Sequence, residues 1–190
     1  MKITPKLLKH DARNVAYHEV SHYLVAKELG LYPATIEIWQ LDGIENLREH
    51  LTVAGRVHFT PTTPYNTCMI GWGGLAGTVL SHQNFVSPRR LAQATLNHYQ
   101  EAKQDQSGSF SKTDERAIGQ ENSLEARLAA CEIVLNNRKE LVSIAGEAVE
   151  HILKHGPAIR FYFPIYNIED VLLQIFAKGP LIRNPSPDAE

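Results

Sequence analysis

The sequence predicts a mainly helical α+β protein with a small β-sheet next to its first long helix. Three observations favour this fold class. Apolar residues in the last third, residues 124–152, recur three, four or seven positions apart, as they do along a buried helix face. Residues 61–88 carry no formal charge and include a glycine-rich apolar run that is long enough for a helix. Two short stretches, residues 35–39 and 55–59, show the alternation and β-favouring residues of strands.

The first helix is bounded by local signals at both ends. Asp11 or Asn14 offers an N-cap, and Gly30 followed by Pro33 offers a stop, which together predict a helix of about five turns. Residues three or four positions apart then share one face of the helix. The residues on this face are Val15, His18, His22, Val25 and Leu29.

The two strands follow the first helix and would lie beside it. Residues 41–51 between them are charged and irregular, and prolines end the second strand. Residues 55–60 are then an exposed strand edge near the first helix, and such an edge holds an extended peptide by backbone hydrogen bonds. The predicted peptide-binding residues are therefore Gly55, Arg56, Val57, His58 and Phe59.

The middle of the chain is predicted to be helical. Residues 65–82 form a buried glycine-rich helix, and residues 89–104 form another that a proline opens. A loop follows at residues 105–109. The segment from Ser111 to Asp114 then matches a capping pattern at the start of a further helix.

The last third forms one long helix or a helical hairpin over residues 124–152. Asn136 and Asn137 mark the predicted break between its two halves. The last ten residues, 181–190, contain two prolines and few apolar side chains, so we expect a flexible tail. Residues 1–180 are therefore predicted to form a single domain.

The sequence HEVSH, from His18 to His22, carries the chemistry of the first helix. The two histidines lie one turn apart on one face, so both imidazoles can reach one metal ion. Glu19 projects from the next position, where its carboxylate can hold a water molecule bound to that ion. Zinc lowers the pKa of such a water, and the carboxylate accepts its proton as the water attacks a carbonyl. The alternative is a pair of partly buried histidines on an amphipathic helix, which would need some other polar partner.

Composition excludes several classes of protein. The chain has 190 residues, of which 43% are hydrophobic and 21% charged, as in ordinary globular proteins. A formal net charge of -2 gives no reason to expect nucleic acid or an acidic membrane as a partner. The N-terminus lacks the apolar core of a signal peptide, and the apolar run at residues 68–80 is too short to cross a bilayer. Cys68 and Cys131 belong to no CxxC pair and are expected to be buried thiols of a cytoplasmic protein.

These segments, in this order, resemble the peptidase domain of FtsH, the ATP-dependent zinc metalloprotease family. Residues 15–25, VAYHEVSHYLV, are similar to the zinc helix of that family. Residues 54–61, AGRVHFTP, resemble its substrate-side strand, and residues 71–76, GWGGLA, its glycine-rich helix. Residues 111–117, SKTDERA, resemble the segment that carries the third metal ligand, and residues 124–152 resemble the terminal helices. The resemblance covers most of the chain.

The resemblance implies that His18, His22 and Asp114 bind one zinc ion per chain and that Glu19 is the general base. From the residues alone, Asp114 is equally well explained as a capping acid of the helix that Ser111 begins. The alternatives for the third ligand are Glu115, His98 and His82.

The chain departs from the family pattern in three places. The spacing between the glycine-rich helix and Asp114 is longer, which predicts an extra helix at about residues 88–106. The arginine and the acid of the family's glycine-rich helix are replaced by Leu75, Gly77 and Thr78, which removes support for the metal ligands. The sequence has no GxxxxGK[ST] motif, so we expect no ATP binding. It also has no predicted transmembrane segment.

The leading prediction is a soluble zinc endopeptidase that cleaves flexible or unfolded polypeptides. It would act alone, as a homo-oligomer or with a separate unfoldase. A second hypothesis is a catalytically silent metal-binding or regulatory module, and a third is a protease dedicated to one partner. The ligand types favour zinc, although two histidines and a carboxylate also accept iron, cobalt or manganese.

Overall fold

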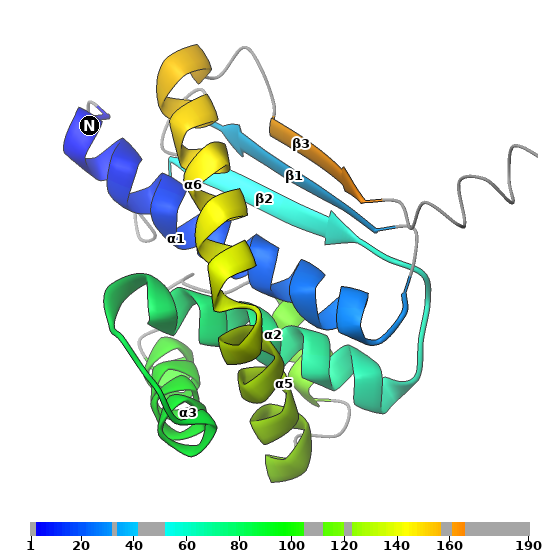
Figure 1. Cartoon of the computed structure of the whole chain (residues 1–190). Helices are drawn as coiled ribbons and strands as arrows, with labels where there is room; N and C mark the ends of the chain where they lie inside the picture. Colours follow the sequence, from blue (N-terminus) through cyan, green and yellow to red (C-terminus); the bar gives the residue numbers. More distant parts are fainter. Residues whose placement is uncertain are drawn as a thin grey trace, which may run out of the picture.

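The computed structural model describes residues 3–31, 34–41, 52–104, 112–119, 123–156 and 161–165. These residues form a mainly helical protein with one small antiparallel sheet, as the sequence predicts (Figure 1). In chain order the elements are α1 (Pro5–Glu28), β1 (Ala34–Gln40), β2 (Val53–His58), α2 (Pro64–His82), α3 (Pro88–Gln104), α4 (Lys112–Gly119), α5 (Leu124–Asn136), α6 (Arg138–His155) and β3 (Phe161–Ile165).

The helix that carries the HExxH motif begins earlier than predicted. Thr4 is its N-cap, because the threonine hydroxyl accepts a hydrogen bond from the backbone N–H of Leu7 at 3.2 Å. Pro5 occupies the first helical position, where its missing N–H costs nothing. The predicted caps at Asp11 and Asn14 are wrong, because both residues lie inside α1.

Asp11 and Asn14 connect α1 to other parts of the fold instead. One carboxylate oxygen of Asp11 accepts hydrogen bonds from the backbone N–H and the hydroxyl of Thr52, both at 2.9 Å. The hydroxyl of Ser81 donates to the amide oxygen of Asn14 at 2.8 Å. At the other end of α1, Gly30 follows the helix with a positive φ of 70°, which confirms the predicted stop.

The three strands form an antiparallel sheet in the order β2-β1-β3. β1 and β2 confirm the two predicted strands, and Ile38 lies opposite Gly55. β2 is at an edge of the described sheet, although it ends at His58 and Phe59 follows it. The sequence patterns do not predict β3, which contains Pro164 and lies at the other edge, where a strand tolerates proline.

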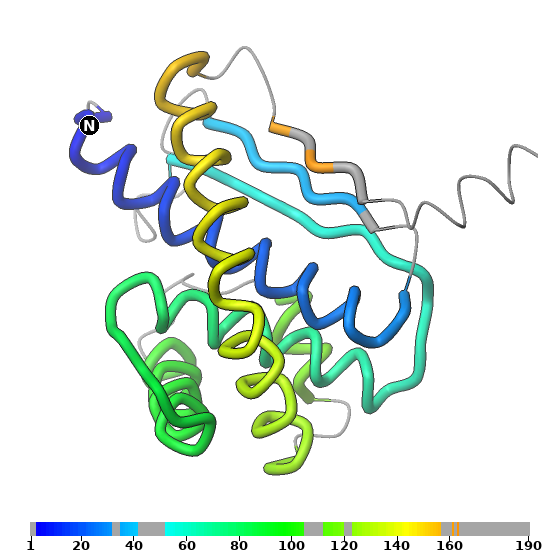
Figure 2. Tube along the Cα trace, in the orientation of Figure 1, coloured from blue at the N-terminus to red at the C-terminus, as the bar shows by residue number. Residues whose placement is uncertain are grey.

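The sheet and α2 lie on opposite sides of α1. Figures 1 and 2 show α1 running between the sheet and α2, with α6 crossing it. Ile36 and Ile38 of β1 are fully buried, as are Val20 and Leu24 of α1. The HExxH helix is therefore held on two sides by packed apolar surface, which gives its side chains a fixed frame.

The glycine-rich helix α2 is buried, as predicted for residues 65–82. Every residue of α2 from 68 to 81 is buried, and the helix packs against α1, α3, α4 and α5. Cys68 of α2 and Cys131 of α5 are buried free thiols, as predicted. In the described part of the chain, no helix is long and apolar enough to span a membrane.

The remaining helices follow the sequence patterns. α3 confirms the helix predicted at residues 89–104. α5 and α6 meet at Asn137, whose side-chain amide donates to the Ile133 carbonyl at 3.0 Å and to a Glu28 carboxylate oxygen at 3.1 Å. Figure 2 shows α6 leading away from α5 with a bend, so the pair is not a hairpin. The predicted loops and tail at residues 42–51, 105–109 and 181–190 lie outside the described residues.

Candidate metal centre

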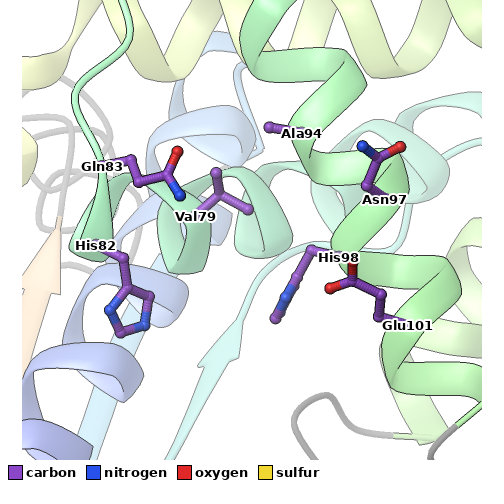
Figure 3. Close-up of a pocket in the computed structure, with 7 residues that line it drawn as sticks. All are labelled: Val79, His82, Gln83, Ala94, Asn97, His98 and Glu101. Carbon is purple, nitrogen blue, oxygen red and sulfur yellow. The ribbon is translucent and has the colours of Figure 1, made fainter.

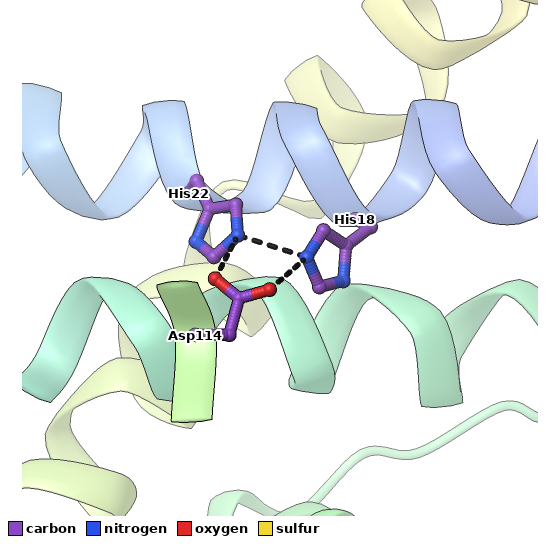
Figure 4. A group of neighbouring side chains, drawn as sticks. All are labelled: His18, His22 and Asp114. Atoms are coloured by element: carbon purple, nitrogen blue, oxygen red, sulfur yellow. Dashed lines mark hydrogen bonds and ion pairs between the residues drawn. The ribbon is translucent and has the colours of Figure 1, made fainter. Parts of the chain in front are cut away.

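Two imidazoles from α1 meet at one point between α1, α2 and α4 (Figure 4). The Nε2 atoms of His18 and His22 lie 2.9 Å apart, and the rings meet edge to face with centroids separated by 4.5 Å. Only about a tenth of each side chain is exposed, 12% and 9% respectively. The helical spacing of four residues therefore directs both rings to the same buried point.

Asp114 reaches this point from the first turn of α4. One of its carboxylate oxygens lies 3.1 Å from Nε2 of His18, and the other lies 3.2 Å from Nε2 of His22. Among the histidine, cysteine, aspartate and glutamate side chains of the described ranges, His18, His22 and Asp114 form the one cluster that could hold a metal ion. An acid in the first turn of a helix also favours that helix. Ser111, the predicted capping residue, lies outside the described residues.

The second nitrogen of each ring is held by an oxygen atom. Nδ1 of His22 lies 2.7 Å from the carbonyl oxygen of Ile70, which only accepts, so Nδ1 carries the hydrogen. Nδ1 of His18 lies 3.0 Å from the hydroxyl of Thr78, which donates to the Gly74 carbonyl at 3.3 Å and so accepts from the ring. By this assignment both Nε2 atoms present lone pairs to each other and to the carboxylate.

Three acceptors that face one another in a buried site need a cation among them, which is a proton on His22 in the protein without metal or a metal ion when one is bound. Two imidazoles and a carboxylate are ligands that zinc takes at about 2.0–2.2 Å in a tetrahedron, which places ligand atoms about 3.3 Å apart. The two Nε2 atoms lie 2.9 Å apart, and one ligand atom from each of the three residues lies within 4.8 Å of the other two. Three protein ligands also leave the fourth position to a water molecule, as in catalytic zinc sites. The residues present therefore fit zinc.

The charges of the group reinforce one another in the protein without metal. Burial by itself raises the pKa of Asp114, but the nearby His22 and His18 hold this pKa well below its usual range. Burial by itself lowers the pKa of His22, but the charge and hydrogen bond of Asp114 raise it to about 9. The site thus stabilises a positive charge among its three side chains.

Glu19 lies beside this group and beneath β2. The residue is 8% exposed, and burial raises the pKa of its carboxyl although His18 and His22 act in the opposite direction. A Cβ atom at Gly55 would lie 2.5 Å from Cγ of Glu19 and 2.9 Å from Cγ1 of Val15. Glycine at this position therefore allows the strand to approach the predicted base closely.

Glycines of α2 make room for the histidines on the other side. A Cβ atom at Gly74 would overlap Cε1 and Nε2 of His22 and would lie 2.9 Å from Cε1 of His18. A Cβ atom at Gly77 would overlap the backbone of Tyr17 and the side chain of Ser21. The glycine-rich pattern of α2 thus serves close packing of two helices around the site.

Replacing Gly74 with alanine is expected to weaken zinc binding by about 5- to 150-fold, because overpacking costs about 1–3 kcal/mol and displaces the His22 ring. Competition with a chromophoric chelator measures the zinc Kd. Gly146→Ala is the matched control, because a Cβ atom at this position of α6 meets nothing within 4 Å. Unchanged zinc affinity in Gly74→Ala would contradict the role of the two rings as ligands.

Replacing Thr78 with valine is expected to raise the zinc Kd by about 10- to 100-fold, because it removes the acceptor that orients the His18 ring. The same chelator competition measures this change. Thr67→Val is the control, since Thr67 of α2 donates to the carbonyl four residues earlier but holds no histidine. Equal zinc affinities in the two variants would show that Thr78 does not orient His18.

The predicted peptide-binding residues of β2 divide between two faces of the sheet. Gly55 faces α1, whereas Arg56 points to the opposite face and forms an ion pair with Glu37 at 2.7 Å. His58 lies on that opposite face too, 3.9 Å from Glu37. The side chains of Arg56 and His58 therefore lie away from the metal centre, and only the strand backbone is placed to meet a substrate there. Val57 and Phe59 are partly buried and pack against the core.

The three alternative ligands lie outside the group that could hold a metal ion. Glu115 forms an ion pair with Lys103 of α3 at 3.0 Å. His82 and His98 line a separate cavity between α2 and α3. Asp114 is thus the one of the four candidates that the fold brings to both imidazoles.

Two residues of the centre have no counterpart in the sequence predictions. Ile70 contributes a backbone carbonyl, which no side-chain pattern reveals. Thr78 stands where the resemblance suggested a loss of support, yet its hydroxyl holds His18. The nearest signal in the sequence is the glycine-rich run itself, which indicates close approach of another helix.

Comparisons with protein-family models, with curated proteins and with solved structures found no match to this chain.

Proposed function

We propose that this protein is a zinc-dependent endopeptidase that hydrolyses peptide bonds in flexible or unfolded polypeptides. The observation that carries the proposal is the convergence of three buried acceptors, the Nε2 atoms of His18 and His22 and the carboxylate of Asp114. Glu19, the residue next to His18, adds a buried carboxylate beside them. This is the ligand set and the base that a zinc hydrolase requires.

Each side chain then has a defined task. Zinc, when bound by His18, His22 and Asp114, supplies a Lewis acid and a water of lowered pKa. The carboxylate of Glu19 accepts the proton of the attacking water and returns it to the amine that leaves. Thr78 keeps the His18 ring in the orientation that aims Nε2 at the site.

A peptide substrate would bind along the edge of β2. The close approach of Gly55 to Glu19 places the strand backbone next to the predicted base. Because Arg56 lies on the far face of the sheet, binding by β2 would come from backbone hydrogen bonds. Such binding accepts many sequences but requires an extended chain.

The sequence resemblance to the FtsH peptidase domain supports peptides over other carbonyl substrates. An HExxH centre by itself is compatible with hydrolysis of several carbonyl compounds. This chain contains no GxxxxGK[ST] motif, so the proposed substrates of this chain by itself are segments that are already flexible.

Cleavage of a permanently unfolded protein tests the proposal. The zinc-loaded protein is expected to produce fragments that mass spectrometry identifies, a chelator to stop their formation, and added zinc to restore it. Fragments that persist with the chelator, or a zinc-loaded protein that never cuts, would refute the proposed activity.

One observation favours a second candidate, a metal-binding module that does not turn over. Glu19 is only 8% exposed and lies directly beneath Gly55, so access to the base is narrow. This candidate expects stoichiometric zinc, zinc-dependent stability and no fragments from any unfolded substrate.

A further inference from the structure

A cavity of about 320 Å³ lies between the C-terminal end of α2 and α3 (Figure 3). Val79 and Ala94 contribute apolar side chains to its lining. His82 extends from the end of α2, and His98 from α3, with the carboxylate of Glu101 beside His98 in Figure 3. The cavity is thus apolar in one part and polar in another, as binding sites for small groups are.

The cavity adjoins the metal centre. Val79 directly follows Thr78, whose hydroxyl contacts His18. His98 also lies close enough to His18 for the two side chains to interact electrostatically. A substrate held at the metal centre would therefore place a neighbouring side chain within reach of the cavity.

Glu101 is the lining residue with a formal charge. Burial lowers the pKa of both His82 and His98, although Glu101 opposes this at His98, so both imidazoles are mainly uncharged at neutral pH. Arg13 of α1 lies near His82 and also lowers its pKa. The negative end of the cavity is therefore at Glu101, on α3.

Side-chain amides line both sides of the cavity, Asn97 near Glu101 and Gln83 near His82 (Figure 3). Their carbonyl oxygens accept hydrogen bonds, and that of Asn97 already accepts one from Gln93 at 2.9 Å. Nε2 of His98 is buried and has no hydrogen-bond partner in the described structure. A ligand with several N–H donors would satisfy these groups together with the carboxylate.

We propose that this cavity is a substrate subsite for lysine or arginine side chains, with the apolar stem against Val79 and Ala94 and the cationic end at Glu101. The inference rests on the proposed peptidase function and deepens it. Backbone binding along β2 does not select among substrate side chains, whereas this cavity would select basic ones. The subsite depends on α3, the helix that distinguishes this chain from the pattern it resembles. The proteins or segments cleaved would then be basic near the cut.

Peptide binding tests the subsite without requiring turnover. The zinc-loaded Glu19→Gln protein is titrated with labelled octapeptides. In each set, one position carries lysine, norleucine or glutamate and the other positions are identical, and the varied position is moved along the peptide from set to set. At one position lysine is expected to bind about three- to fivefold more tightly than norleucine, because Glu101 is exposed and exposed ion pairs contribute up to about 1 kcal/mol. Adding Glu101→Gln removes this difference and Glu101→Lys favours the glutamate peptide, whereas the control Glu132→Gln on α5 changes nothing. Equal binding of lysine and norleucine at every position overturns the proposal.

Cleavage maps of an unfolded protein separate the subsite from the peptidase function. Wild type is expected to enrich lysine and arginine at one fixed position from the cut, and Glu101→Gln to lose this enrichment while it still cleaves. Cleavage with no basic preference would overturn the subsite and leave the peptidase. Lysine binding that depends on Glu101, without any cleavage, would support the subsite and refute the peptidase.

Discussion

Replacing Glu19 with glutamine is expected to lower the rate of peptide hydrolysis by about 100- to 10,000-fold, the range that general base catalysis contributes. Glutamine has nearly the same shape, so the close contact beneath Gly55 is preserved. An amide cannot accept the proton of the attacking water, which is the task proposed for this side chain. The zinc content is expected to remain one ion per chain, because Glu19 is not among the three converging ligands.

The measurement is the initial rate of fragment formation, with zinc content determined on the same samples. Glu28→Gln is the matched control, since Glu28 is an exposed glutamate at the end of the same helix. Turnover that survives in Glu19→Gln would remove Glu19 from the role of base. Loss of zinc in this variant would show that Glu19 binds the metal.

Replacing Asp114 with asparagine is expected to raise the zinc Kd by more than about 100-fold, beyond the range known for residues that only support ligands. The substitution keeps the shape of the side chain but removes the negative charge that faces His18 and His22. It also separates the two explanations of Asp114. A residue that only stabilised the first turn of α4 would alter thermal stability and leave zinc affinity unchanged.

Glu115→Gln is the control for this experiment, because it removes the adjacent acid from the same helix. Glu115 pairs with Lys103 rather than with the imidazoles, so its zinc Kd is expected to equal that of wild type. Chelator competition measures both variants. A weaker zinc affinity in Glu115→Gln than in Asp114→Asn would reverse the assignment of the third ligand.

The sequence signals for regular elements were accurate where they depended on local periodicity. The alternation in residues 35–39 and the charge-free run in residues 65–82 correspond to β1 and α2. They were less accurate where several local signals compete. Thr4, Asp11 and Asn14 are all good N-caps by residue type. Only the folded structure shows that Thr4 caps α1, whereas Asp11 bonds to Thr52 and Asn14 to Ser81.

The short strand β3 shows a different limit of local patterns. Its five residues include a proline, and nothing in that segment alone distinguishes an edge strand from a loop. It exists because β1 offers a free edge on which it can pair, with Phe161 opposite Ile38. That edge is created by a segment more than a hundred residues earlier in the chain.

The sequence by itself determined the pair of imidazoles, because helix geometry alone puts His18 and His22 on one face. It also placed Glu19 beside them and predicted the helix at residues 89–104, which is α3. Each of these follows from residues within a single element.

Only the tertiary structure decided what completes the site. Asp114 lies 96 positions from His18, and the Ile70 carbonyl that orients His22 has no side-chain signal. The cavity lined by His82, His98 and Glu101 likewise depends on how α3 packs on α2. The physical reason is that hydrogen bonding within an element is local, whereas the burial that brings distant elements together depends on the whole chain.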